Sequence, residues 1–193
     1  MRGMKIIGLA LGVILLIGTA SSAMAATVVA DFDALPLAAN YICCNVPFNS
    51  NGVTGTTAAF QWSNLVWTTD GFAQVDNNLY SGGSLQDLWI NNINVEFDWD
   101  AALTSILLLY GEYGGNINVE VNGDFHNVQN FADLPPVIGG AAVTVIDFGI
   151  PGNGTGELRL TGTINSFSIG GQELWIDYVT GETQQCFISE VMK

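Results

Sequence analysis

Short apolar runs with an alternating pattern recur along this 193-residue chain, and turn-forming residues separate them. The runs are rich in valine, isoleucine, threonine and aromatic residues, a composition typical of β-strands. Turns are predicted at pairs such as Asn51-Gly52 and Gly82-Gly83, and Asn122-Gly123 marks the clearest tight hairpin. The pattern predicts strands over residues 27–32, 60–68, 94–99, 104–110, 116–121, 143–148, 157–161 and 173–179.

Helical periodicity is absent from this pattern, because no segment of useful length repeats its apolar positions every 3.6 residues. Residues 100–109 are the nearest rival, and their apolar run Ile106-Leu107-Leu108-Leu109 is more typical of a buried strand. Many short strands between regular turns predict an all-β fold, a single-domain antiparallel β-sandwich of the jelly-roll type. We assign this domain to residues 26–181 and expect a C-terminal tail over residues 182–193.

The first 25 residues have the pattern of a cleaved signal peptide. Arg2 and Lys5 precede an apolar run over residues 6–17, and Ala23-Met24-Ala25 offers the small residues of a cleavage site. The run of about 12 residues is shorter than the roughly 20 that a membrane-spanning helix needs. We therefore expect a secreted protein, extracellular or periplasmic, that does not insert into a membrane after signal cleavage.

Basic residues are nearly absent, since 4 lysines and arginines stand against 18 aspartates and glutamates. Removal of the signal leaves only Arg159 and Lys193. Nucleic-acid binding depends on cationic side chains that replace the phosphate counterions, so this composition excludes it. Binding to anionic lipid surfaces is disfavoured for the same reason. Charged residues make up only 11% of the chain, so we expect a neutral, polar surface suited to uncharged partners.

Three cysteines, Cys43, Cys44 and Cys186, allow one disulfide at most. Export would permit the bond. Because a bridge between adjacent cysteines is strained, Cys186 is the expected partner for either of the other two. The alternative is that all three thiols stay reduced.

Three short motifs occur in a fixed order along the chain. They are Ala30-Asp31-Phe32-Asp33, Ser81-Gly82-Gly83-Ser84-Leu85 and Trp175-Ile176-Asp177-Tyr178-Val179. This order resembles the galactose-binding-like jelly rolls among bacterial carbohydrate-binding modules, which open with a Phe-Glu/Asp element and close with an Ile-Asp-Asp-Val strand. The resemblance implies a non-catalytic domain that binds a carbohydrate or another extracellular matrix component.

The resemblance also implies a structural calcium ion between the first and last strands. By position, Asp33 matches the acid of the opening element and Asp177 the first acid of the closing one, whereas Tyr178 replaces the usual second acid. Asp31 would share a strand face with Asp33 and add a third carboxylate. Calcium prefers six to eight oxygen ligands, so carbonyls and waters would complete the site. The alternative is that these acids face water at strand edges.

A second acidic pattern, Glu96-Phe97-Asp98-Trp99-Asp100, places three acids on one face of a strand. It is similar to the catalytic element of laminarinase-type glycoside hydrolases, which are retaining enzymes. Retention needs carboxyl groups about 5 to 5.5 Å apart, whereas positions four apart on a flat strand lie roughly 13 Å apart. We therefore expect no enzyme activity, with such a hydrolase as the alternative.

Trp67, Trp89 and Tyr113 stand next to polar or glycine-rich turns. We expect these rings to be exposed and to stack on sugar rings, whose apolar C–H faces suit an aromatic face. A binding module predicts exposed aromatics on a concave face or a loop rim, and a hydrolase predicts the three acids in an open cleft. A purely structural surface or matrix protein predicts an apolar patch or a free strand edge instead.

Overall fold

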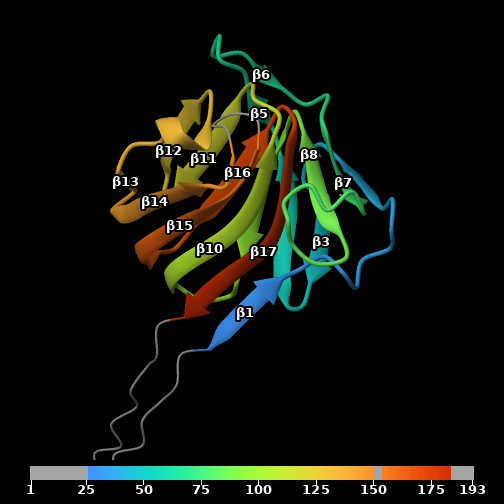
Figure 1. Ribbon diagram of the computed structural model, residues 1–193, viewed down its shortest axis with the longest axis horizontal. Coiled ribbons are helices and arrows are strands. Elements are labelled where there is room, and N and C mark those ends of the chain that lie inside the picture. The colour runs from blue at the N-terminus through green and yellow to red at the C-terminus, as the bar shows by residue number, and fades with distance from the viewer. Residues whose placement is uncertain (1–25, 150–153, 184–193) are drawn as a thin grey trace, which may run out of the picture.

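Two antiparallel β-sheets packed face to face form the molecule (Figure 1). The computed structural model describes residues 26–149 and 154–183. The predicted all-β antiparallel sandwich is confirmed. In these two ranges no helix is long and apolar enough to cross a membrane. The predicted signal peptide and Cys186 lie outside the described residues, as does the predicted tail beyond residue 183.

The larger sheet, sheet A, has the strand order β13-β14-β15-β10-β17-β8-β7-β2, and β1 pairs with the C-terminal half of β17. A short 3₁₀ turn, η1 (Phe131–Asp133), precedes β13. The strands of sheet A are β1 (Thr27–Ala30), β2 (Asn40–Ile42), β7 (Phe72–Asp76), β8 (Asp87–Asn91), β10 (Leu103–Glu112), β13 (Val137–Ile138), β14 (Ala141–Asp147), β15 (Gly154–Ile164) and β17 (Leu174–Thr183).

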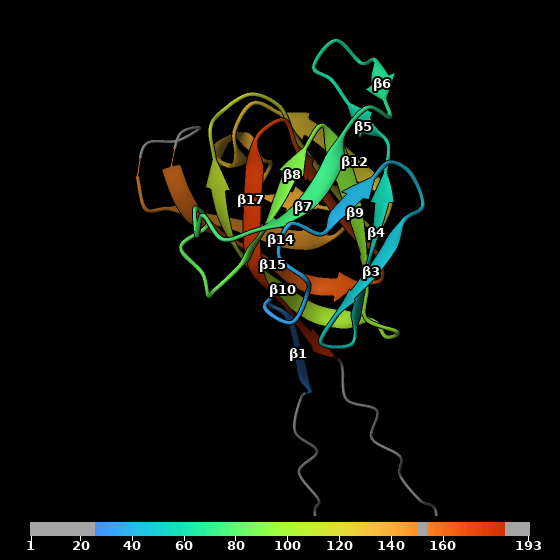
Figure 2. The ribbon, with the colours of Figure 1, turned by 90° about the vertical axis from the view of Figure 1, so that its right-hand side faces the viewer.

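The smaller sheet, sheet B, has the order β12-β11-β16-β9-β4-β3. From β9 onward the chain repeatedly changes sheet, which is the wiring of a jelly roll. A separate two-stranded hairpin projects from the end of the sandwich that lies opposite β1 (Figures 1 and 2). The strands of sheet B are β3 (Pro47–Ser50), β4 (Val53–Ala58), β9 (Ile93–Asp98), β11 (Ile117–Val121), β12 (Asp124–Val128) and β16 (Phe167–Gly171), and the hairpin consists of β5 (Phe60–Gln61) and β6 (Trp67–Thr68).

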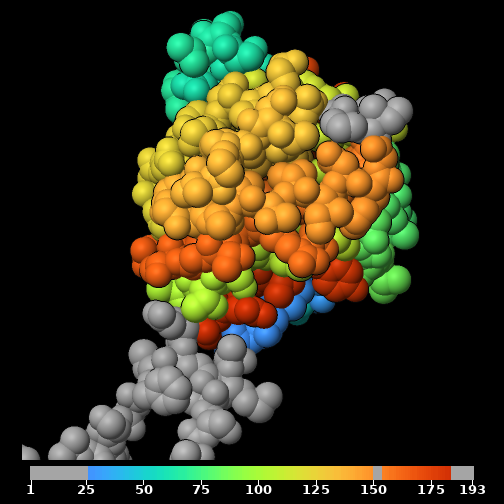
Figure 3. Space-filling model, turned by 60° about the vertical axis from the view of Figure 1, so that its left-hand side comes forward, coloured from blue at the N-terminus to red at the C-terminus, as the bar shows by residue number. Residues whose placement is uncertain are grey.

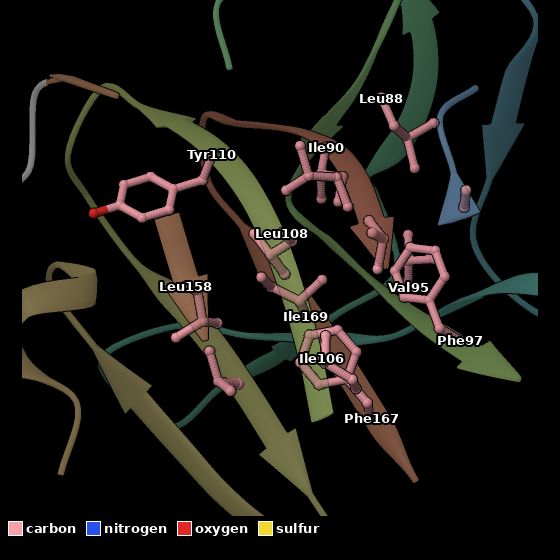
Figure 4. Close-up of a cluster of buried hydrophobic side chains, with 14 of the residues drawn as sticks. Leu88, Ile90, Val95, Phe97, Ile106, Leu108, Tyr110, Leu158, Phe167 and Ile169 are labelled. Carbon is pink, nitrogen blue, oxygen red and sulfur yellow. The ribbon is translucent and has the colours of Figure 1, made fainter. Parts of the chain in front are cut away.

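Side-chain alternation along the strands builds the core between the sheets. On β9, Val95 and Phe97 are buried, while Glu96 and Asp98 are exposed on the outer face. Burying one large aliphatic or aromatic side chain contributes about 1.5–3 kcal/mol, so a one-residue slip of this strand would be costly. Figure 4 shows side chains of the two sheets meeting in this core, among them Ile106, Leu108, Leu158, Val95, Phe97 and Ile169.

Residues 60–68 do not form the single strand that the apolar pattern predicts. They form the β5–β6 hairpin, in which the Trp62 N–H donates to the Val66 carbonyl at 2.8 Å. The Asn64 side chain accepts the N–H of Val66 at 3.1 Å. This asparagine supplies a local hydrogen-bond partner that competes with a straight strand, which explains the turn.

The disulfide also differs from the expected pairing. Cys43 is bonded to Cys44 in the segment between β2 and β3, so the expectation that Cys186 pairs with one of them is wrong. Cys43 also packs against the core at the edge of sheet A.

Candidate functional site

The residues predicted to form a site lie on two different faces of the sandwich. Asp177 and Trp89 stand on the outer face of sheet A, because their strand neighbours Ile176 and Leu88 are buried in the core. Glu96 and Asp98 stand on the outer face of sheet B. The structure therefore separates the predicted metal ligands from the predicted acidic strand.

Two buried carboxylates, Asp87 and Asp177, lie on sheet A beneath residues 80–86, and we call them the buried carboxylate group. The half-buried Asp33, in the segment between β1 and β2, lies beside Asp177. The Ser84 hydroxyl lies 3.0 Å from both Asp33 Oδ1 and Asp177 Oδ2. Asp33 Oδ1 also accepts the amide N–H groups of Leu85 at 3.1 Å and of the next residue at 3.0 Å. Ser84 thus joins the two acids that the sequence motifs paired.

The carboxylates of this group also accept hydrogen bonds from backbone amide and hydroxyl donors. Asp177 accepts the amide N–H of Ser84 at 2.5 Å and that of Tyr178 at 2.7 Å. Asp87 accepts the Ser81 hydroxyl at 2.7 Å and the Ser81 amide at 3.0 Å. Gly83 lies so close to Asp177 that a Cβ at this position would be 1.9 Å from the carboxylate oxygen. The serines and glycines of residues 81–84 therefore fit the loop onto the carboxylates.

Burial changes the acidity of this group. Asp177 and Asp87 are both 0% exposed. Burial raises the pKa of Asp177 to about 6, against the opposing effect of the Ser84 and Tyr178 donors, and the charge of Asp87 adds to the rise. Burial also raises the pKa of Asp87, with the charge of Asp76 as a smaller cause. These carboxylates serve mainly to fix the loop to the sheet.

The predicted calcium site does not assemble into a metal cage by itself. Asp31 Oδ1 accepts the N–H of Asp33 at 3.2 Å. Over residues 26–149 and 154–183, no three Asp, Glu, His or Cys side chains are arranged to hold a metal ion. The oxygens of Asp33 and Asp177 that meet at Ser84 already accept hydrogen bonds. Calcium at Asp31, Asp33 and Asp177 stays a prediction.

Trp89 and Tyr113 belong to one aromatic cluster on sheet A. Trp89 stacks parallel to Trp175 with ring centroids 5.5 Å apart, and Tyr113 stacks on Tyr80 at 4.6 Å. Trp175 joins the two pairs through edge-on contacts with both tyrosines. Tyr113 is 54% exposed, but its ring face is occupied by Tyr80. The cluster mainly packs against itself, which reduces the area open to a ligand.

Sheet B carries a hollow of about 510 Å³ on its outer face. We call it the acidic hollow, and it is lined by Thr56, Glu96, Asp98, Glu120, Ser166 and Ser168, among others. Strand register creates it, because Glu120 pairs with Ser168, Ser168 with Glu96, and Glu96 with Thr56 across four strands. These side chains share one face, and none of them enters the core.

Asp100, the third acid of the predicted catalytic strand, does not line the hollow. Strand β9 ends at Asp98, and Asp100 lies in the following turn with a positive φ of 56°. Its amide N–H donates to Asp98 Oδ1 at 2.9 Å. The prediction that Glu96, Asp98 and Asp100 share one strand face is therefore wrong, because this local bond turns the chain.

The β5–β6 hairpin covers the neighbouring part of the same face and is held there by asparagines. Asn116 and Asn127 donate to the Gln61 carbonyl at 2.6 and 2.7 Å, and Asn94 donates to the Ala59 carbonyl at 2.7 Å. Asn94 comes from β9, Asn127 from β12 and Asn116 from the position before β11, so three segments of sheet B bind the backbone of residues 59–61. The hairpin thus covers the part of this face next to the hollow, and none of its residues lines the hollow itself.

Trp67 lies near the acidic hollow without lining it, and Phe125 connects the two. The Trp67 ring is 5.6 Å from that of Phe125, and Phe125 pairs with Glu120, which lines the hollow. In the space-filling view of Figure 3 the hairpin rises beside the surface formed by β11 and β12. Trp67 is 53% exposed, and Leu65 and Val66 next to it are also exposed. The hairpin tip therefore forms an apolar patch.

Sequence reasoning missed Glu120, Ser168 and Phe125. Glu120 stands in an alternating strand, the one local signal that it faces away from the core. Its position beside Ser168 depends on pairing between segments far apart in the chain, which no local motif encodes. Comparison with protein-family models, curated proteins and solved structures finds no match for this chain. The resemblance to galactose-binding-like jelly rolls stays a prediction.

Proposed function

We propose that this protein is a secreted, non-catalytic domain that binds a glycan in the acidic hollow of sheet B. One observation carries the proposal: open carboxylates and hydroxyls line a hollow of about 510 Å³. The exposed Trp67 lies nearby, in contact with Phe125, whose strand partner Glu120 lines the hollow. The volume of the hollow is in the range of ligand pockets, roughly 300–1,000 Å³. An extracellular matrix polysaccharide is the partner that this chemistry suits.

The hollow offers both kinds of contact that sugars use. Carboxylates such as Glu96 and Glu120 accept hydrogen bonds from sugar hydroxyls, and bonds to a charged acceptor are stronger than neutral ones. The hydroxyls of Thr56 and Ser168 both donate and accept. The exposed ring of Trp67 offers an apolar surface to the C–H face of a sugar.

Replacement of Trp67 tests the location of the glycan-binding site. A glycan array first identifies a ligand, and titration calorimetry then compares Trp67→Ala with Tyr113→Ala. The two rings are almost equally exposed, at 53% and 54%, but Trp67 lies in the hairpin that covers sheet B and Tyr113 in the aromatic cluster of sheet A. We expect Trp67→Ala to weaken binding about tenfold through lost ring contact and Tyr113→Ala to leave it unchanged. The reverse result would place the site on sheet A, and no glycan binding at all would contradict the proposal.

A glycoside hydrolase is the second candidate, and one observation favours it. Glu96 and Glu120 lie on either side of β16, so their backbones are roughly 10 Å apart. Inverting hydrolases hold their two carboxyl groups about 6.5–9.5 Å apart, whereas retaining enzymes need about 5–5.5 Å. Release of reducing ends from the bound glycan, lost in Glu96→Gln, would support this alternative over simple binding.

A structural matrix protein is the third candidate. The exposed side chains of Leu65, Val66 and Trp67 form the apolar patch that such a protein predicts. Light scattering over a range of protein concentrations tests it. Concentration-dependent assembly that Leu65→Ser abolishes would favour this candidate over glycan binding.

A further inference from the structure

The acidic hollow concentrates negative charge in a site open to ligands. Glu96, Asp98 and Glu120 line it, and its other polar lining residues are neutral. Asp98 stands two residues from Glu96, roughly 7 Å along the strand, and Glu120 stands roughly 10 Å away across β16. Carboxylates are negatively charged at neutral pH, so a ligand in the hollow meets acids on two sides.

Basic side chains do not offset this charge within the described residues. Arg159 is the one lysine or arginine of residues 26–149 and 154–183. It pairs with Glu157 on β15, in the opposite sheet. His126 pairs with Asp124, and its register partner Val119 is a core residue, so the imidazole faces away from the hollow. A cationic ligand group would therefore meet no protein cation in the hollow.

The electrostatic consequence is a selection among glycans. A protonated amine forms charge-assisted hydrogen bonds with carboxylates, and complementary charge favours one partner while like charge rejects another. A uronate or a sulfated sugar would bring a like charge to Glu96, Asp98 and Glu120. A neutral sugar would gain the hydrogen bonds without the charge.

We infer that the acidic hollow selects glycans that carry free amino groups, such as oligomers of deacetylated amino sugars, over N-acetylated and anionic ones. This inference rests on the proposed glycan-binding function and specifies its ligand class. Glu96 and Glu120 receive the ammonium group, and Trp67, which contacts Phe125 beside Glu120, offers a stacking surface to a sugar further along the same chain.

Calorimetric titration with matched oligosaccharides tests the inference. The probes are glucosamine, N-acetylglucosamine and galacturonate oligomers of equal length, at mildly acidic pH where the sugar amine is protonated. We expect the glucosamine oligomer to bind at least tenfold more tightly than its N-acetylated counterpart, and the galacturonate oligomer to bind most weakly. The preference should shrink at high salt, because exposed charges are screened.

Charge-removing variants separate the hollow from the overall negative charge of the chain. Glu96→Gln and Glu120→Gln should each lower the preference for the amine several-fold while binding of the N-acetylated oligomer is kept. Glu173→Gln is the matched control, because Glu173 is exposed in the turn between β16 and β17 and does not line the hollow. This control should leave the preference unchanged.

Each result that would overturn the inference is distinct. Equal binding of the glucosamine and N-acetylglucosamine oligomers would refute the amine preference and leave the glycan-binding proposal in place. An equal loss of preference in Glu96→Gln and Glu173→Gln would attribute the attraction to net charge, which also refutes it. Absence of binding by all three oligomers and by the glycan array would refute the inference and the proposed function together.

Discussion

Both sheets carry acidic side chains on their outer faces, but the surroundings of these acids differ. On sheet A, Asp177 is fully buried beneath residues 80–86, and it accepts two amide N–H groups and a hydroxyl. On sheet B, Glu96 is exposed in an open hollow. An acid surrounded by donors of its own chain contributes to folding, whereas an acid open to solvent is free to meet a ligand. Partners, rather than residue type, separate the two roles.

The aromatic side chains repeat this contrast. Tyr113 and Trp67 have nearly equal exposure, but Tyr113 stacks on Tyr80 within a cluster joined by Trp175. Trp67 contacts Phe125 beside the acidic hollow. Exposure alone therefore does not identify a binding aromatic, because the neighbours decide which ring faces are open.

The largest expected effect is a loss of stability when Asp177 of the buried carboxylate group is replaced. In Asp177→Ala the part-buried amide N–H groups of Ser84 and Tyr178 and the Ser84 hydroxyl lose their acceptor, and leaving a buried partner unsatisfied costs up to about 1–3 kcal/mol. We expect a loss of about 4 kcal/mol in the free energy of unfolding near pH 4, measured by urea denaturation. The control Glu96→Ala should stay within about 0.5 kcal/mol of wild type. Similar losses of unfolding free energy in both variants would contradict the proposed difference between the acids of the two sheets.

The stability difference between wild type and Asp177→Ala should also depend on pH. Burial raises the pKa of Asp177 to about 6, above the value of roughly 3.9 expected in the unfolded chain. The folded protein thus binds more protons between these values, and the stabilising contribution is complete below about pH 4 and is lost as pH rises through about 6. The stability gap between wild type and Asp177→Ala should narrow by about 3 kcal/mol from pH 4 to pH 7.

Urea denaturation at several pH values measures this gap. The comparison with Asp177→Ala cancels the contributions of acids that do not interact with Asp177. A gap that widens with pH would mean that the carboxylate is stabilised in its charged form, and would overturn the assignment of burial as the dominant cause.

A smaller loss of stability is expected when one of the asparagines that hold the β5–β6 hairpin on sheet B is replaced. Asn116→Ala removes the 2.6 Å bond to the Gln61 carbonyl and should lower stability by about 1 kcal/mol. Hydrogen exchange should accelerate across residues 59–68, and glycan binding should weaken because Trp67 loses its fixed position. The control Asn77→Ala replaces an exposed asparagine after β7 and should change neither quantity. Unaltered exchange in Asn116→Ala would show that the asparagines do not hold the hairpin.

The sequence was informative where a strand alternates long apolar side chains with polar ones. Strands β9 and β11 are predicted for that reason, and β10 is predicted from its continuous apolar run Ile106–Leu109. Strand β4 was missed because its buried positions include Gly55, whose Cα faces the Phe48 ring so closely that a Cβ would lie 2.2 Å away. Small residues that accommodate a ring leave no apolar alternation for a sequence pattern to detect.

The candidate site was predictable only in part. The motifs placed Asp33 near Asp177, and the structure joins them through Ser84. The acidic hollow was not predictable as a whole, because Glu96 meets Ser168 and Glu120 only through long-range strand register. Asp100 was wrongly included since its local bond to Asp98 ends the strand.

The central claim is that the outer face of sheet B binds the glycan, whereas the acids on the outer face of sheet A only stabilise the fold. An NMR titration of the labelled protein with a glucosamine oligomer tests this claim. We predict chemical-shift changes at Thr56, Glu96, Glu120, Ser168 and the Trp67 indole N–H, with Trp89, Tyr113 and residues 80–86 unchanged. Changes confined to the aromatic cluster and residues 80–86 of sheet A would contradict the account.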